Sequence, residues 1–107
     1  MTVDVTLQAL ADPTRRAICQ RLAHGRASIG QLAALFPISR PAVSQHVRIL
    51  ADAGLVQTGA GRQRPYQLQA EPLLLLENWL SGLIHAWEGA PLPPDTARSD
   101  VTPRSGT

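Results

Sequence analysis

The chain of 107 residues is long enough for one domain with a core of modest size, and its 44% hydrophobic and 17% charged residues are ordinary for a soluble globular protein. The net charge of +2 is small, no apolar run approaches the about 20 residues that a membrane span needs, and the N-terminus lacks the basic start and apolar stretch of a signal peptide. Because Cys19 is the only cysteine, an internal disulfide is excluded, and we expect a cytoplasmic protein with no membrane partner.

Two helices are predicted before residue 25. The first is short, at about 3–10, and its apolar residues are expected to face the core, namely Val3, Leu7 and Leu10. The second begins at Asp12-Pro13, because an aspartate at the N-cap accepts backbone N–H bonds and a proline suits the first helical position. It is expected to run to about residue 24 and to end at Gly25. Its apolar face, on which Cys19 is expected to be an inert core thiol, consists of Ile18, Cys19 and Leu22.

A third helix is predicted to begin at Ser28. The motif Ser28-x-x-Gln31 is a capping box, in which each of the two side chains bonds to the backbone N–H of the other residue. A tight connection at residues 37–38 leads into the next helix. The apolar face of the third helix is expected to consist of Leu32, Leu35 and Phe36.

The fourth helix has two different faces. It is capped by Ser39, it has Pro41 in its first turn, where a missing N–H costs little, and it stops at Gly54. Apolar residues at i, i+4 and i+7 place its core face at Val43, Val47 and Leu50. The opposite face suits a DNA groove, because small residues permit close approach while Gln and Arg reach base edges. That face carries Arg40, Pro41, Ala42, Ser44, Gln45 and Arg48.

Residues 55–68 are expected to form two short strands around a turn. Gly59 and Gly61 permit the turn, and Pro65 cannot donate to a strand ladder, so its strand should lie at an edge. Helix, turn, helix and hairpin in this order is the winged helix-turn-helix pattern, whose second helix enters the DNA major groove. The fold class we predict is mainly α with a small β-hairpin: about five helices plus a two-stranded wing.

A last helix, at about 72–87, has more apolar surface than a terminal helix of one small domain needs. Exposed patches of this size usually mark an interface, so we prefer a dimer helix to simple packing on the core. The predicted dimerisation residues are Leu73, Leu76, Leu80, Leu83, Ile84 and Trp87. Beyond them Pro, Ser, Thr and Gly dominate, which predicts a domain at 1–88 and a disordered tail at 89–107.

Positive charge is concentrated in the middle of the chain. There is no lysine, and the segment from Pro13 to Tyr66 holds eight arginines but a single acidic residue, Asp52. Such a segment is typical of proteins that bind a polyanion, although a solvated basic surface has the same composition. Charge alone therefore leaves both alternatives open.

Four segments together resemble the ArsR/SmtB family of bacterial winged-helix repressors: residues 10–18, 39–50, 53–56 and 61–62. The resemblance covers about residues 5–88 in the same order. It implies a homodimer, built on the first and last helices, that sits on a palindromic operator in double-stranded DNA and blocks transcription. By position it implies DNA contacts for Ser39, Arg40, Ser44, Gln45, His46, Arg48, Arg62 and Arg64.

These residues are expected to make two kinds of contact with DNA, to base edges and to phosphates. Arg40, Gln45 and Arg48 can make directional base contacts, whereas Ser39, Ser44 and His46 suit phosphate. His46 lies beside Val43 on the helix, so a partly buried packing role is the alternative. The wing arginines, Arg62 and Arg64, would meet the backbone or the minor groove, or would simply be exposed. Two further arginines, which either reach phosphate or pair with Asp12 or a partner subunit, are Arg15 and Arg16.

Many members of this family sense metals. The thiolate site needs a Cys-x-Cys pair in the helix that begins at Ser28, and that pair is absent. The second family site joins the paired last helices; His85-x-x-Glu88 matches one half of it, while the other half has only Glu77 as its nearest carboxylate. A shared four-ligand site across two chains stays an alternative, but a solvated polar edge is the preferred interpretation, and no cofactor is expected.

The preferred function is therefore a sequence-specific DNA-binding transcriptional regulator, a repressor acting as a homodimer, with an unidentified effector or partner protein. The alternatives are a metal-responsive regulator that uses the last helix, and a winged-helix protein-interaction module. The interaction module has no need of a cationic, small-residue face. An enzyme is not expected, because the sequence has no Gly-rich phosphate loop, no Ser/His/Asp or Cys/His motif and no clustered metal ligands.

Overall fold

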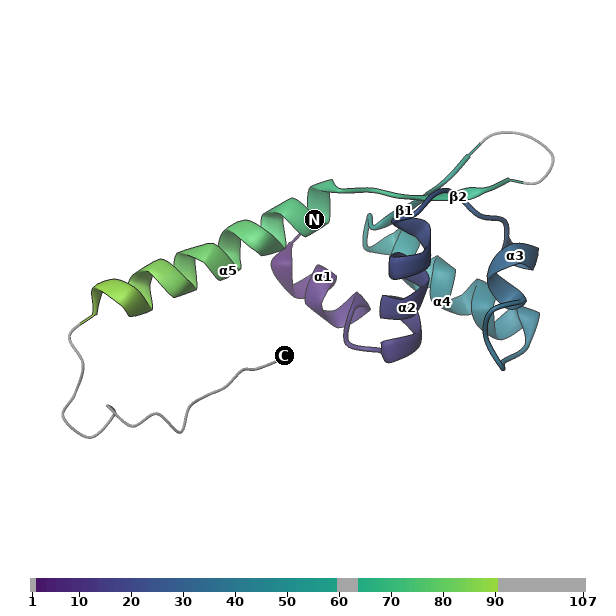
Figure 1. Ribbon diagram of the computed structural model, residues 1–107, viewed down its shortest axis with the longest axis horizontal. Helices are drawn as coiled ribbons and strands as arrows, with labels where there is room; N and C mark the ends of the chain where they lie inside the picture. Colours follow the sequence, from purple (N-terminus) through teal and green to yellow (C-terminus); the bar gives the residue numbers. More distant parts are fainter. Residues whose placement is uncertain (1, 60–63, 91–107) are drawn as a thin grey trace.

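The computed structural model describes residues 2–59 and 64–90, and it contains the predicted elements in the predicted order (Figure 1). This confirms a mainly α fold with a small β-hairpin, the winged helix-turn-helix. The predicted tail beyond residue 90, and Arg62 in the hairpin turn, lie outside the described residues. The elements are α1 (Val3–Ala9), α2 (Pro13–Leu22), α3 (Ile29–Ala33), α4 (Arg40–Asp52), β1 (Val56–Thr58), β2 (Tyr66–Leu68) and α5 (Glu71–Gly89).

The predicted helix caps are present. Asp12 Oδ2 accepts the backbone N–H of Arg15 at 3.0 Å, and Ser39 Oγ accepts that of Ala42 at 3.2 Å. The capping box is complete, since Ser28 Oγ accepts the backbone N–H of Gln31 and the Gln31 side chain accepts that of Ser28. These bonds satisfy backbone donors that the first turn of a helix leaves without partners. They fix where α2, α3 and α4 begin.

The core lies between α2, α3, α4 and β1, and the predicted apolar faces of α2 and α4 are confirmed. Five side chains in it are 0% exposed: Ile18, Leu32, Val43, Leu50 and Leu55. α4 ends just beyond its last buried turn, where Gly54 adopts a φ of +79° that few other residues accept. The same core holds Cys19 from α2.

Two predicted core positions are wrong. Leu35 is 56% exposed, because α3 ends at Ala33 and the helical spacing does not continue past that residue. On α1, Leu7 is exposed while Thr6 and Ala9 are buried. The hydroxyl of Thr6 donates to the carbonyl of Thr2, so this polar side chain is buried with its hydrogen bond made.

β2 forms backbone hydrogen bonds on both of its sides, with β1 on one and with Ala27 on the other. Val56 pairs with Leu68 and Thr58 with Tyr66 across the two strands. Tyr66 also exchanges two backbone hydrogen bonds with Ala27, of 2.7 and 3.1 Å, which tie the hairpin to the α2–α3 connection. Pro65 precedes β2, so its missing N–H removes no bond from the ladder.

α5 projects away from the rest of the molecule as a long rod (Figure 1). It runs through Gly89, two residues past its predicted end, and its first turns pack against α1. Its apolar residues beyond Leu76 are exposed in the single chain, and Trp87 is 66% exposed. No helix in the described part of the chain is both long and apolar enough to cross a lipid bilayer.

We expect Leu50→Ala to lower the free energy of unfolding by roughly 2–5 kcal/mol, because it leaves a cavity in the core. Leu35→Ala makes the same chemical change at an exposed position and should cost much less. Urea denaturation of both variants measures the difference. Equal losses would contradict the assignment of Leu50 to the core and Leu35 to the surface.

Burial raises the pKa of the Cys19 thiol from 9.0 to about 11. The thiolate is the reactive form, so at about pH 8 the native protein should be alkylated far more slowly than the denatured chain. The folded state also holds this proton more tightly, so its contribution to stability is present below pH 9 and is lost as the pH rises toward 11. Mass spectrometry follows the alkylation, and rapid labelling of the native protein would contradict the prediction.

Candidate nucleic-acid interface

The exposed face of α4 lines a shallow hollow. Because Val43, Val47 and Leu50 are buried, the opposite side of the same helix faces solvent. The hollow has a volume of about 440 Å³ and lies between the start of α3 and α4. It brings together four of the residues predicted to contact DNA. Its lining consists of Ile29, Arg40, Pro41, Ser44, Gln45 and Arg48.

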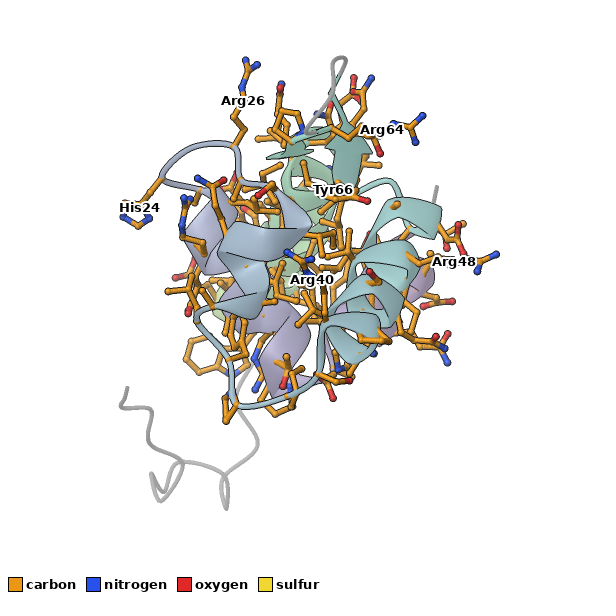
Figure 2. The ribbon with its side chains drawn as sticks, turned by 90° about the vertical axis from the view of Figure 1, so that its right-hand side faces the viewer. His24, Arg26, Arg40, Arg48, Arg64 and Tyr66 are labelled. Carbon is orange, nitrogen blue, oxygen red and sulfur yellow. The ribbon has the colours of Figure 1, made fainter. Side chains whose placement is uncertain are left out.

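Gln45 and Arg48 are free to bind a partner. Both are exposed, and within the described residues neither side chain makes a hydrogen bond or an ion pair. Arg48 extends away from α4 into solvent (Figure 2). Ser44, one residue before Gln45, is small and exposed, so a DNA groove can approach the helix closely at this point. This arrangement suits base edges, which glutamine and arginine recognise with paired hydrogen bonds.

Arg40 is exposed, and its guanidinium lies against α3 (Figure 2). A Cβ added at Gly30 of α3 would lie 2.5 Å from a terminal nitrogen of its guanidinium, so the glycine leaves room for this group. Ser39 uses its hydroxyl as the N-cap of α4. Arg40 lines the hollow, and Ser39 precedes it in the chain at the start of α4.

His46 does not line the hollow. Its side chain is 23% exposed, and its Nδ1 lies 3.4 Å from Nη1 of Arg15 and 3.9 Å from Oδ2 of Asp12. These contacts favour the packing interpretation of His46 over a phosphate contact. The backbone N–H of Arg15 lowers the pKa of Asp12, so the carboxylate beside His46 is charged at neutral pH.

Arg15 and Arg16 have partners that the sequence did not predict. Arg15 donates from Nε to the carbonyl of Ala9 at 2.6 Å, and Arg16 donates from Nη1 to the carbonyl of Leu10 at 2.8 Å. Neither guanidinium pairs with the carboxylate of Asp12 within the described residues. The signal that could have found these bonds is position: both arginines closely follow the end of α1, whose last carbonyls need donors.

The hairpin contributes a further cation. Arg64 is exposed two residues before β2 and has a φ of +45°. Arg26, which sequence reasoning left unassigned, extends outward on the hairpin side of the molecule (Figure 2). It precedes Ala27, which pairs with Tyr66, so backbone pairing brings it beside the hairpin. No local sequence pattern indicates that pairing.

On α5 the polar candidate Glu77 lies among the predicted dimerisation residues, whereas His85 and Glu88 do not line the same groove. An open groove of about 410 Å³ along the helix is lined by Leu73, Leu76, Glu77, Leu80, Ser81 and Ile84. His85 Nδ1 lies 3.9 Å from Glu88 Oε1, and both side chains are largely exposed. Over residues 2–59 and 64–90, no group of three or more His, Cys, Asp or Glu residues is placed to hold a metal ion. Glu77 therefore does not complete a site with His85 and Glu88 inside one chain.

Comparison with known proteins agrees with this geometry. Residues 10–58 match a protein family described as a helix-turn-helix domain. The chain is 54% identical over 74 residues to the HTH-type transcriptional regulator Rv2034 of Mycobacterium tuberculosis. The aligned segment covers 68% of this chain and 69% of that protein. It is 34% identical over 79 residues to the transcriptional repressor SdpR of Bacillus subtilis, with 73% and 88% covered.

The likeness extends to solved structures. A crystal structure of an ArsR family transcriptional regulator superposes with a TM-score of 0.76 at 35% identity, and the match covers 82% of this chain and 92% of that one. Such identity over most of both chains goes beyond a shared fold. The relatives are DNA-binding regulators and not enzymes. This chain belongs to the ArsR family of winged helix-turn-helix transcriptional regulators.

Proposed function

We propose that this regulator is a homodimeric repressor that reads a palindromic operator in double-stranded DNA through α4. The observation that carries the proposal is the presence of two separate surfaces that no other part of residues 2–59 and 64–90 covers. One is the polar, cationic hollow on α4, and the other is the apolar face of α5. A repressing action is supported by relatives such as the transcriptional repressor SdpR.

The α4 surface has the chemistry of a base-reading helix. A bidentate arginine selects guanine and a bidentate glutamine selects adenine, so Arg48 and Gln45 would specify two neighbouring bases. Arg40 and Ser39, at the start of the helix, would fix its register on the phosphates. Arg64, with Arg62 beside it in sequence, would contact the backbone or the minor groove on the flank.

The α5 surface supports the dimer. Leu80, Leu83, Ile84 and Trp87 are each at least 44% exposed, and burying such side chains stabilises an interface by about 1.5–3 kcal/mol each at full burial. Two copies related by a two-fold axis would present two α4 helices in opposite orientations. Half-sites would then be inverted repeats centred about one turn of DNA apart, or a multiple of it. A repressor bound in this way blocks transcription by occupying the promoter.

We expect Gln45→Ala and Arg48→Ala each to reduce the preference for operator over random duplex by about 1–3 kcal/mol, because each variant loses a bidentate base contact. The operator is the duplex that the unmodified chain enriches from a randomised pool, and fluorescence anisotropy at one fixed salt concentration measures both affinities. Arg48→Lys keeps the positive charge but lacks the planar guanidinium. It should therefore lose the preference for operator over random duplex while keeping the salt dependence of binding.

Gln20→Ala is the matched control, because Gln20 is exposed on α2 and does not line the hollow. It should leave the preference unchanged. Full operator preference in both the Gln45 and Arg48 variants would show that α4 is not the reading helix. Binding of the unmodified chain that does not weaken steeply with added salt would reject DNA as the partner of this face.

We expect Leu80→Glu and Leu83→Glu to give monomers that bind the operator weakly, because each places a charge in the proposed interface. Asn78→Glu adds the same charge on the opposite side of α5 and should leave the dimer intact. Light scattering measures the mass of each variant. A dimer mass for both leucine variants would exclude this face of α5 as the interface.

A further inference from the structure

Three helices meet at one side chain, that of Arg15. Its guanidinium donates to the carbonyls of Ala9 and Gln8, which close the end of α1, at 2.6 and 3.2 Å. Its Nη1 lies 3.4 Å from Nδ1 of His46 on α4, and its own backbone N–H is bound by Asp12, the N-cap of α2. We call Asp12, Arg15 and His46 the three-helix junction. It links the helix that packs against α5 to the helix that lines the hollow.

The contacts within the junction are directional. A guanidinium only donates, so Nδ1 of His46 accepts from Arg15 when the imidazole is neutral with its proton on Nε2. Asp12 Oδ2 lies 3.9 Å from the same nitrogen, which is beyond hydrogen-bonding range. The His46 side chain is 23% exposed, so water competes only in part for this contact. Arg15 can serve α1 and α4 together because its planar fork carries five donors in fixed directions.

We propose that Arg15 and His46 are positioning residues that set the direction of α4 relative to the dimer helices, and thereby the half-site spacing that the dimer accepts. The inference rests on the proposed dimeric function. The core beneath α4 is built mainly from α2, α3 and β1, and α1 contributes only Ala9, at its last turn. α5 projects away from this core, and α1 packs against its first turns. The junction is therefore a direct polar link between α1 and α4.

Loss of the junction should affect one kind of binding and spare another. A single half-site touches one DNA-binding unit, whose fold depends on the core and the caps. A full palindrome is bound well only when both units meet their half-sites together, so its affinity depends on how firmly each unit is held to the dimer axis. Variants in the junction should therefore lower the ratio of full-site to half-site affinity.

Three variants and one control separate the possibilities. His46→Leu removes the acceptor, whereas His46→Asn restores an amide oxygen near the position of Nδ1. Arg15→Lys keeps the charge but cannot reach α1 and α4 at once. Arg16→Ala is the matched control: Arg16 binds the carbonyls of Leu10 and Ala11 at the same end of α1 and has no bond to α4 within the described residues.

The probes are the duplex that the unmodified chain enriches from a randomised pool and the same duplex with one half-site scrambled. Anisotropy titrations at fixed salt, with dimer mass and melting temperature measured in parallel, give the two affinities. For His46→Leu and Arg15→Lys we expect the full-site to half-site ratio to fall about tenfold, with half-site affinity within about twofold of the unmodified chain. His46→Asn should restore most of the ratio, and Arg16→Ala should not change it.

An equal loss on both duplexes would overturn the inference, because it would mean that His46 touches DNA or supports α4 itself. An unchanged ratio, or the same fall in Arg16→Ala, would also overturn it. The double variant Arg15→Lys/His46→Leu gives an independent check: a loss no larger than that of the worse single variant supports one shared contact, and additive losses contradict it. If the unmodified chain itself shows no preference for two half-sites, the dimeric proposal fails, and this inference with it.

Discussion

The surface that α4 offers to DNA depends on the burial of its other face. Val43, Val47 and Leu50 are inserted among α2, α3 and β1, and each residue along a helix turns the face by about 100°. A different choice of buried residues would therefore turn Gln45 and Arg48 out of the hollow. The cap at Ser39 fixes where the helix begins, so rotation and register are both set before any DNA is bound. Close packing allows this surface to be preformed, because a well-packed core does not adjust continuously.

Burial fixes the rotation of α4 about its own axis but not its direction relative to a second subunit. That direction depends on the connections between the DNA-binding unit and α5. One connection is made by the backbone: the N–H of Gln69 donates to the carbonyl of Leu55 at 2.8 Å. The buried Pro72 follows in the first turn of α5. At the side-chain level, Arg15 joins α1 to α4. In the proposed dimer, these connections are the route by which the second subunit would orient the exposed face of α4.

Cap signals in the sequence were reliable, and errors arose where helical spacing was extended past the end of a helix or where a side chain depends on distant residues. The caps at Asp12, Ser28 and Ser39 involve residues only three apart, and all were predicted. Leu35 was misplaced because its spacing was extended past the last residue of α3. His46 had two open interpretations, because helical periodicity places it beside Val43 but cannot show that Arg15, 31 positions away, lies against it.

The arginine excess that first indicated a polyanion partner is used in two ways at once. Arg15, Arg16 and Arg21 donate to backbone carbonyls at helix ends, so part of the basic segment serves the fold. Carbonyls accept hydrogen bonds without neutralising the charge, and these guanidinium groups therefore still add to the positive field that attracts DNA at long range. Arg48 makes no such bond within the described residues and is left for short-range recognition. Counting charges leaves a polyanion partner and a solvated basic surface both open, whereas the hydrogen bonds separate the arginines that hold the helices from those that can contact bases.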